Sequence, residues 1–315
     1  MSVLDVRLKW LFSLAALLLV CSSARLVGAE NKDRPAAKEK KERPAEAAKP
    51  GRPAGKEQKD RPAGNAKPVR VLPMLREGDE IRCLGGFAPN GHIQGIATDG
   101  KSIYWVFTAS VVRTDLNGKV LAKRGLPQHG GDPCFAEGKL FIPLGDRFNQ
   151  PPKKNAKGPG DRVLVLSPDL KETRFIPVPK FPFGLGGLAF RNGRFYAVGG
   201  RPAGKPGNTV YEFDRNFKLL KRHELNVNSE AGIQTINFTP GGRCLLGCYG
   251  VGNFSVELDG KLRISRRVRP GLPFGAIPLD DWLVLAAKPR YTPERKCAGA
   301  IAKVYRLKAA PRPGK

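Results

Sequence analysis

Five copies of one strand–turn–strand pattern occupy residues 71–310, and this repetition limits the folds open to the chain. Each copy has a small or Gly-rich start, a short apolar run, a tight polar turn and a second apolar run. A third apolar run follows in every copy, and a fourth follows in the first four copies. The inner turns are centred near Gly100, Gly138, Gly193, Gly242 and Asp281. Short runs between Gly, Asn, Asp and Pro clusters predict strands, and no convincing amphipathic helix is visible.

The inner turns recur roughly every 40 to 55 residues, which is the size of a four-stranded β-propeller blade. We therefore predict an all-β, five-bladed β-propeller, because a radial array leaves few strand edges exposed. The fifth unit lacks an outer strand, whereas residues 80–84 precede the first unit and belong to no unit. We predict that this run pairs beside residues 300–307 and closes the ring. The alternative is an open β-sandwich with a stray N-terminal strand.

Two segments carry a likeness to known repeats, residues 161–169 (Asp-Arg-Val-Leu-Val-Leu-Ser-Pro-Asp) and residues 208–214 (Asn-Thr-Val-Tyr-Glu-Phe-Asp). Through segments such as these, residues 71–310 resemble the secreted β-propeller repeats of the YVTN and NHL kind. The likeness lies at the level of the repeat and implies a propeller fold. The Gly-His and Trp-Asp dipeptides that characterise WD repeats do not occur at equivalent positions of these units.

Residues 1–29 have the pattern of an export signal. Arg7 and Lys9 open it, an apolar stretch follows, and Val27-Gly28-Ala29 offers small residues for cleavage. We therefore expect an exported protein, either secreted, periplasmic or in the cell envelope. One alternative is a retained membrane anchor, although the stretch is shorter than the ~20 residues that span a bilayer. The other alternative is cleavage before Cys21 with lipidation of that residue.

Residues 30–70 contain almost no large apolar side chains, and the tripeptide Arg-Pro-Ala recurs in them at a regular interval. Such a segment buries too little surface to offset its ordering entropy. We predict a disordered basic linker here, followed by the propeller at residues 71–310 and a short tail at residues 311–315. A loose electrostatic tether to an acidic envelope polymer is the functional alternative to a plain spacer.

The chain holds 55 Lys and Arg against 28 Asp and Glu, a net charge of +27, which favours anionic partners. In a propeller, the loops that join blades share a face with the loops between second and third strands. We call this the long-loop face, and the opposite one the short-turn face. The three longest of these loops hold ten basic and three acidic residues, whereas the turns of the short-turn face are balanced. The candidate basic residues are Arg147, Lys153, Lys154, Arg201, Lys205, Lys288, Arg290 and Arg295.

The long-loop face also carries the residues that open each innermost strand, around the predicted central funnel. His92 and His129 occupy equivalent places in adjacent blades, and they are two of only 3 His in the chain. Further polar candidates near the same openings are Gln94, Asp132, Glu230 and Gln234. Such residues either bind a ligand or hydrogen-bond the backbone of the next blade.

We therefore predict a non-catalytic binding module for an anionic partner, which is an acidic polysaccharide, an envelope polymer or a protein. The chain shows no strong catalytic motif and implies no cofactor. The alternative is a metal-dependent hydrolase of the propeller lactonase type, with a divalent metal held by funnel residues such as His92, His129, Asp132 and Glu230. Export and the lack of aromatics among the basic residues disfavour nucleic acid. Membrane contact is expected only peripherally or through the signal region.

Removal of the signal with Cys21 leaves five cysteines, an odd number. Cys83 and Cys297 are the candidate disulfide, because the predicted ring closure brings their strands together. Buried free thiols are the alternative.

Overall fold

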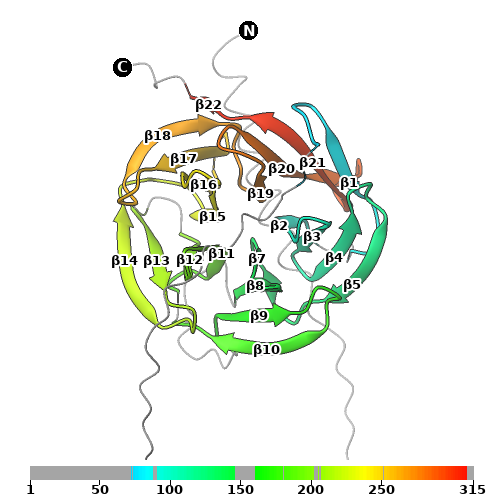
Figure 1. Cartoon of the computed structure of the whole chain (residues 1–315), viewed down its shortest axis with the longest axis horizontal. Helices are drawn as coiled ribbons and strands as arrows, with labels where there is room; N and C mark the ends of the chain where they lie inside the picture. Colours follow the sequence, from blue (N-terminus) through cyan, green and yellow to red (C-terminus); the bar gives the residue numbers. More distant parts are fainter. Residues whose placement is uncertain are drawn as a thin grey trace, which may run out of the picture. The chain divides into compact units, whose positions relative to one another are not determined.

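The computed structural model describes residues 72, 74–87, 91–145, 160–179, 181–201, 205, 207–250 and 252–310. Every regular element in these ranges is a β-strand, and the strands form five antiparallel sheets around a common axis (Figure 1). Within the same ranges there is no helix with the length and apolar character needed to span a membrane. The expected export signal and linker at residues 1–70 and the tail at residues 311–315 lie outside the described residues.

The first three blades follow one another along the chain, and each starts at the axis and ends at the rim. Blade 1 contains β2 (Ile93–Thr98), β3 (Ser102–Phe107), β4 (Ser110–Asp115) and β5 (Val120–Gly125). Blade 2 contains β6 (His129–Gly130), β7 (Cys134–Ala136), β8 (Lys139–Gly145), β9 (Arg162–Leu166) and β10 (Glu172–Pro177). Blade 3 contains β11 (Leu185–Arg191), β12 (Arg194–Gly199), β13 (Asn208–Phe213) and β14 (Leu219–Leu225).

The last two blades each include a strand from elsewhere in the sequence. Blade 4 contains β15 (Ile233–Phe238), β16 (Cys244–Cys248), β17 (Phe254–Leu258), β18 (Ile264–Arg269) and, at its outer edge, β22 (Lys308–Ala309). Blade 5 contains β19 (Ala276–Pro278), β20 (Leu283–Tyr291), β21 (Cys297–Arg306) and, outermost, β1 (Glu80–Cys83). The addition of β22 to blade 4 had no counterpart in the sequence prediction.

The ring closes where the sequence predicted. β1 pairs antiparallel with β21, with Glu80 opposite Lys303 and Cys83 opposite Ala300. One blade therefore combines strands from both ends of the propeller, and Figure 1 shows β1 beside β21. The predicted five-bladed propeller is confirmed, and the open β-sandwich is wrong.

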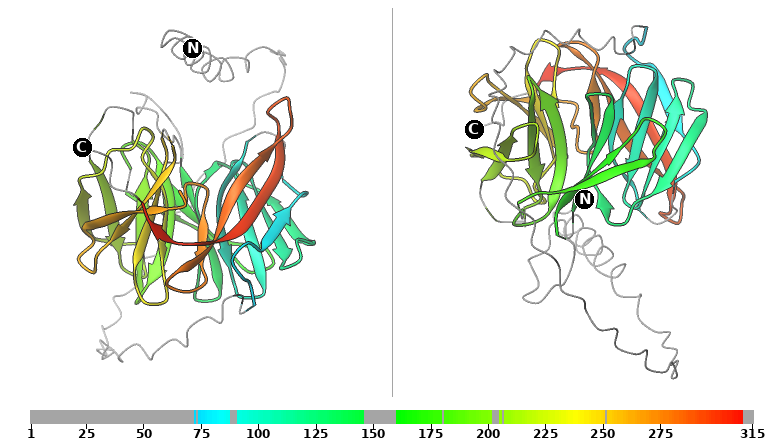
Figure 2. Two further views of the ribbon diagram at one scale, coloured as in Figure 1. Left: turned by 90° about the horizontal axis from the view of Figure 1, so that it is seen from above. Right: turned by 60° about the horizontal axis from the view of Figure 1, so that its bottom comes forward.

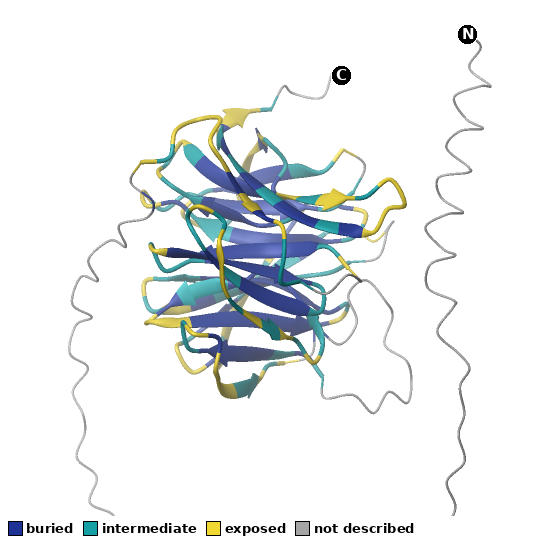
Figure 3. Cartoon of the chain, turned by 90° about the vertical axis from the view of Figure 1, so that its right-hand side faces the viewer, coloured by how far each residue is buried: buried dark blue, intermediate teal, exposed yellow. Residues whose placement is uncertain are grey.

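Figure 3 shows strands that are largely buried and connecting turns that are largely exposed. Burial also decreases from the inner strands of a blade to its outer strands. In blade 1 every residue of β3 is buried, whereas no residue of β5 is. Trp105 of β3 is fully buried, and its indole N–H donates to Thr114 Oγ1 at 2.9 Å. The apolar runs found in the sequence thus form the inner strands, and the charged runs form the outer edges.

Backbone packs against backbone at the axis, because glycines occupy the points where the inner strands meet. A Cβ atom at Gly95 would lie 2.3 Å from Asp132 Cα. One at Gly275 would lie 2.6 Å from Gly95 Cα, and one at Gly187 would lie 2.5 Å from the Gln234 carbonyl oxygen. Only a residue without a side chain allows such contacts. Main chain and the Asp132 side chain therefore fill the centre of the ring.

The outer hairpins on the short-turn face share one turn design. An aspartate ends or directly follows the third strand, and its Oδ1 accepts bonds from the backbone N–H groups two and four residues later. This holds for Asp115, Asp214 and Asp259. In blade 2 Ser167 occupies the same place, and its hydroxyl donates to the Lys171 carbonyl. Several acids of this face thus form turns.

The expected disulfide is not formed, because Cys83 and Cys297 are free thiols. The register gives the reason: Cys83 lies opposite Ala300, three residues along β21 from Cys297. At ~3.3 Å per residue the offset is about 10 Å along the strand, which is beyond the reach of a disulfide. Burial raises the pKa of the Cys83 thiol to about 12, and the nearby Cys297 adds to this shift.

Ring closure makes a testable contribution to stability. Ile81 of β1 is 3% exposed and packs in the core shared by blades 1 and 5. We expect Ile81→Ala to lower the free energy of unfolding by about 2–4 kcal/mol, measured by chemical denaturation. Leu121→Ala is the control, since Leu121 on outer strand β5 is 48% exposed and should change stability by less than about 0.5 kcal/mol. Equal effects would show that β1 does not hold the ring closed.

Candidate functional site

A side-chain hydrogen bond links blades 1 and 4 at the long-loop end of the axis. His92, just before β2, bonds through Nε2 to the Tyr249 hydroxyl at 3.0 Å. The Gln94 side-chain amide lies 3.2 Å from the same Nε2 and donates to Thr108 Oγ1 at 3.1 Å. Since both neighbours of Nε2 can donate, the arrangement fits the neutral imidazole with its hydrogen on Nδ1.

An aromatic ring from blade 5 completes this group. Phe274, just before β19, lies edge-on to the His92 ring, with centroids 5.8 Å apart. It makes a similar contact with Tyr249 at 5.3 Å. We call His92, Gln94, Thr108, Tyr249 and Phe274 the mouth cluster. Its side chains come from three blades, so it exists only in the closed ring.

The mouth cluster is neutral at physiological pH. Burial, together with a smaller effect of the nearby His129, lowers the pKa of His92 to about 4. Burial also lowers the pKa of His129, which opens the inner strand of blade 2. Burial and the neighbouring Tyr291 raise the pKa of Tyr249, which keeps its hydroxyl protonated. The structure thus brings His92, Gln94 and His129 together as uncharged hydrogen-bonding groups.

Asp132 lies deeper, on the axis between blades. It is fully buried, and a parallel bridge joins it to Gly187 of blade 3. Burial raises the pKa of its carboxyl well above the usual range, although the backbone amides of Ile96 and Ile236 and the Asn237 side chain act in the opposite direction. The close contact with Gly95 separates this carboxyl from the mouth cluster. Asp132 is therefore part of the closed centre of the ring.

The other polar candidates do not form a metal site with the histidines. Gln234 is buried, and Glu230 is exposed beside the Gly250 turn. Within the described ranges, no three His, Cys, Asp or Glu side chains are placed to hold one metal ion. The ligand set of the lactonase alternative, His92, His129, Asp132 and Glu230, is thus not assembled.

The most prominent basic feature is a hairpin, where the sequence suggested a loop. β20 and β21 extend beyond the ends of the neighbouring strands (Figure 2), and a tight turn at residues 292–296 joins them. We call residues 288–296 the arm. Its exposed side chains include Lys288, Arg290, Tyr291, Arg295 and Lys296. Since Tyr291 is close enough to affect the pKa of Tyr249, the base of the arm lies beside the mouth cluster.

The arm's cations differ from those of the short-turn face in their pairing. Among the described residues, Arg290, Arg295 and Lys296 form no ion pair. On the short-turn face some cations have acidic partners, as in the pairs Lys171–Asp169, Arg215–Glu137 and Arg263–Asp259, whereas others, such as Lys119, Lys218 and Lys261, form no ion pair among the described residues. Lys288 Nζ lies 5.0 Å from the centre of the Tyr305 ring. The arm therefore carries a net positive charge, because four cations stand against one acid, Glu294, and no ion pair joins Glu294 to them among the described residues.

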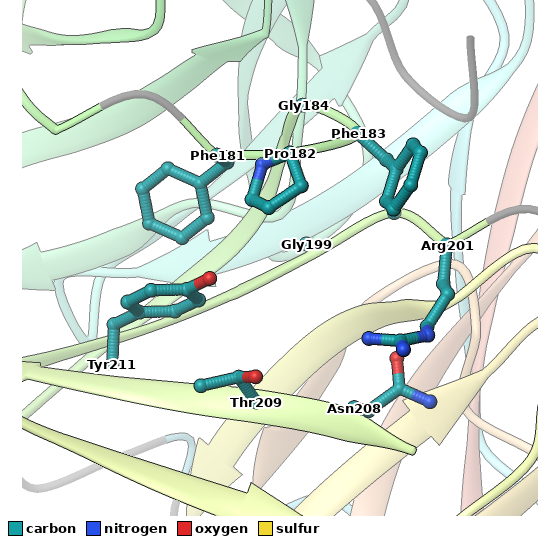
Figure 4. Close-up of a pocket in the computed structure, with 10 residues that line it drawn as sticks. Phe181, Pro182, Phe183, Gly184, Gly199, Arg201, Asn208, Thr209 and Tyr211 are labelled. Atoms are coloured by element: carbon teal, nitrogen blue, oxygen red, sulfur yellow. The ribbon is translucent and has the colours of Figure 1, made fainter. Parts of the chain in front are cut away.

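Two further basic candidates lie on blade 3. Arg201 lines a small pocket of about 50 Å³ with Phe183 and Asn208, among other residues (Figure 4). This volume suits water rather than a ligand. Lys205 is exposed on the same loop. Arg147, Lys153 and Lys154 of the blade 2 loop lie outside the described residues.

Sequence reasoning missed Tyr249, Phe274 and Tyr291. One signal was available: Pro-Phe-Gly occurs twice, at residues 182–184 and 273–275, each time immediately before an inner strand. This repeat marks the entry of a blade on the long-loop face and puts an aromatic side chain there. Tyr249 and Tyr291 have no comparable mark, since each simply follows or ends a strand.

Comparison with solved structures finds propellers at low sequence identity. A glutaminyl cyclase from Myxococcus xanthus is 10% identical, with a TM-score of 0.49 over 75% of this chain and 97% of that one. A Bacteroides caccae protein of unknown function is 13% identical, with a TM-score of 0.46 over 69% and 84%. A gluconolactonase from Xanthomonas campestris is 12% identical, with a TM-score of 0.43 over 75% and 99%. No protein-family model and no curated protein sequence matches. All three TM-scores are below 0.5, and no property of these proteins is transferred to this chain.

The state of His92 can be tested through stability. The pKa of His92 falls from 6.5 to about 4 on folding, because the folded protein disfavours the charged imidazole. The contribution of the neutral His92 to the unfolding free energy is therefore fully present above pH 6.5. That stability is lost as the pH falls from 6.5 towards 4. Between pH 7 and 4 we expect the unfolding free energy of the wild type to fall by about 2 kcal/mol more than that of His92→Gln. Parallel pH profiles from denaturant titrations would show that His92 is not held neutral.

Proposed function

We propose that the long-loop face binds an acidic polysaccharide without catalysis, through the arm and the mouth cluster. One observation carries the proposal: exposed cations without acidic partners in the described chain stand beside a neutral, aromatic hydrogen-bonding site. Cations that are not already neutralised attract an anionic polymer most strongly. Paired cations, such as Arg215 and Arg263 of the short-turn face, have much of their field cancelled by their partners.

The two parts of the face suit different groups of an acidic sugar. Arg290, Arg295 and Lys296 supply positive charge for carboxylates or sulfates, and the guanidinium groups can bind them with two hydrogen bonds. The mouth cluster supplies neutral donors and acceptors for hydroxyl groups, and the Phe274 ring supplies an apolar contact surface. Tyr291 lies between the two parts. Such a site distinguishes an acidic sugar from a simple anion.

The proposal also requires export. The N-terminal pattern of residues 1–29 is typical of an exported protein, and acidic polysaccharides are abundant outside the cytoplasm. In this compartment the basic linker at residues 30–70 would add non-specific attraction to the same polymer. An acidic envelope protein and an anionic membrane surface are the other partners that such charge attracts, and both serve as comparisons in the test.

Charge reversal on the arm tests the proposal. The variant Arg290→Glu/Arg295→Glu/Lys296→Glu should bind polygalacturonate at least about tenfold more weakly than the wild type, measured by calorimetry at about 50 mM salt. Wild-type binding should weaken similarly when the salt is raised to about 500 mM, because screening shortens the range of the attraction. Neutral dextran should not bind.

A matched variant separates the arm from total charge. Lys119→Glu/Lys218→Glu/Lys261→Glu changes the net charge equally, but these residues lie in turns of the short-turn face. It should keep wild-type affinity within about twofold. Equal losses in the two variants would assign binding to overall charge. Binding to anionic vesicles but not to polygalacturonate would replace the polysaccharide with a membrane surface.

A further inference from the structure

Glu230 is an exposed acid on the face to which we assign the binding of an acidic polymer. It lies at the entry of blade 4, three residues before β15. Among the described residues it forms no ion pair. An exposed carboxylate is charged at neutral pH, so it repels the carboxylates of such a polymer. The position of Glu230 therefore bears on which polymer this face prefers.

The stem of the Glu230 side chain lies beside the backbone that follows Tyr249. A Cβ atom at Gly250 would lie 3.2 Å from the Glu230 N atom and 3.4 Å from its Cβ and Cγ atoms. The Tyr249 N–H donates to the Gly232 carbonyl at 3.2 Å, which holds the two segments together. Because Tyr249 belongs to the mouth cluster, the Glu230 side chain starts at the edge of that cluster.

Cations of blade 3 lie on one side of Glu230. The Arg201 N–H donates to the Ala231 carbonyl at 3.2 Å, so this loop begins beside the residue that follows Glu230. The Arg201 guanidinium lines the small pocket of blade 3 (Figure 4), and Lys205 of the same loop is exposed. The blade 3 loop therefore places positive charge next to the entry of blade 4.

Cations of the arm lie on the other side. Blade 4 stands between blades 3 and 5 in the ring (Figure 1), and the arm belongs to blade 5. Tyr291 at the base of the arm is close enough to Tyr249 to affect its pKa. Arg290 and Arg295 of the arm are exposed. A polymer that spans this face thus meets a positive, a negative and again a positive region.

The charge of Glu230 distinguishes between the sugar units of such a polymer. Where every unit is a uronic acid, one of the carboxylates faces Glu230, and like charges at short range repel. An uncharged, N-acetylated unit presents hydroxyl and amide N–H groups, and a carboxylate accepts hydrogen bonds from both. The neutral donors and acceptors of the mouth cluster suit the same unit.

We propose that Glu230 is a specificity-determining residue of the long-loop face. It makes the face prefer polymers in which acidic sugars alternate with uncharged, N-acetylated sugars over polymers made of acidic sugars alone. This inference rests on the proposed function and narrows its ligand class. Glu230 accepts hydrogen bonds from the uncharged unit at the mouth cluster. The arm and the blade 3 loop attract the acidic units on its two sides.

Two unsulfated polysaccharides test the proposal with the full-length chain. Hyaluronate carries a carboxylate on every second sugar and an N-acetylated sugar between, whereas polygalacturonate carries a carboxylate on every sugar. Fragments of about eight sugars of each, titrated by calorimetry at about 50 mM salt, remove the effect of chain length. Net charge alone favours polygalacturonate, so we expect the wild type to show the opposite preference. A wild type that prefers polygalacturonate would overturn the proposal.

Neutralisation of Glu230 tests its role directly. We expect Glu230→Gln to shift the ratio of the two dissociation constants at least about fivefold in favour of polygalacturonate, because a repulsion is removed and an acceptor is weakened. Glu224→Gln is the matched control, since it makes the same change of charge at the rim of blade 3 and should keep that ratio within about twofold. A ratio that Glu230→Gln leaves within about twofold of the wild-type value would overturn the proposal.

The arm variant Arg290→Glu/Arg295→Glu/Lys296→Glu separates this result from a failure of the proposed function. Loss of both polymers in the arm variant, with an unchanged ratio in Glu230→Gln, would keep polysaccharide binding and remove Glu230 as its selective residue. A wild type that binds neither polymer would overturn both proposals. Glu230→Gln should unfold at the wild-type urea midpoint, because Glu230 is exposed and forms no described ion pair.

Discussion

The pairing of β1 with β21 is the constraint on which the other features depend. It joins the two ends of the propeller in one sheet and fixes the fifth blade between its neighbours. The mouth cluster needs this closure, because Phe274 enters from blade 5 and contacts His92 of blade 1. A pocket of about 190 Å³ between the inner strands needs it too, since Ala276, Ile277 and Pro278 of β19 in blade 5 line it. Neither exists in an open sheet.

Close packing at the axis then divides the molecule into two chemically different ends. Gly95, Gly187 and Gly275 let the inner strands approach until Asp132 fills the centre. On the long-loop side, neutral polar groups and aromatic rings lie beside unpaired cations. On the short-turn side, aspartates form turns, and Asp259 also pairs with the neighbouring Arg263. The two faces thus differ in their balance of charge, because the turns of the short-turn face bring an aspartate close to its cations whereas the arm has four cations and one acid.

The fold could be predicted because turn spacing and apolar runs are local properties that recur five times. The closure of the ring followed from one missing strand and one spare strand. Details of register could not be predicted: the three-residue offset separates Cys83 from Cys297, and the extension of β20 turns an expected loop into the arm. At the site, equivalent blade positions indicated His92 and His129. Tyr249 is brought to them from another blade by long-range packing, which no local pattern reveals.

The most direct test of a single binding face is hydrogen–deuterium exchange of the full chain with and without polygalacturonate. Bound polymer should slow amide exchange in the arm and in the segments around His92 and Tyr249. The outer hairpins that begin at Asp115, Asp214 and Asp259 should exchange at unchanged rates. Protection of those hairpins, or weak protection spread evenly over both faces, would contradict the account that charge sorted by the closed ring creates one binding face.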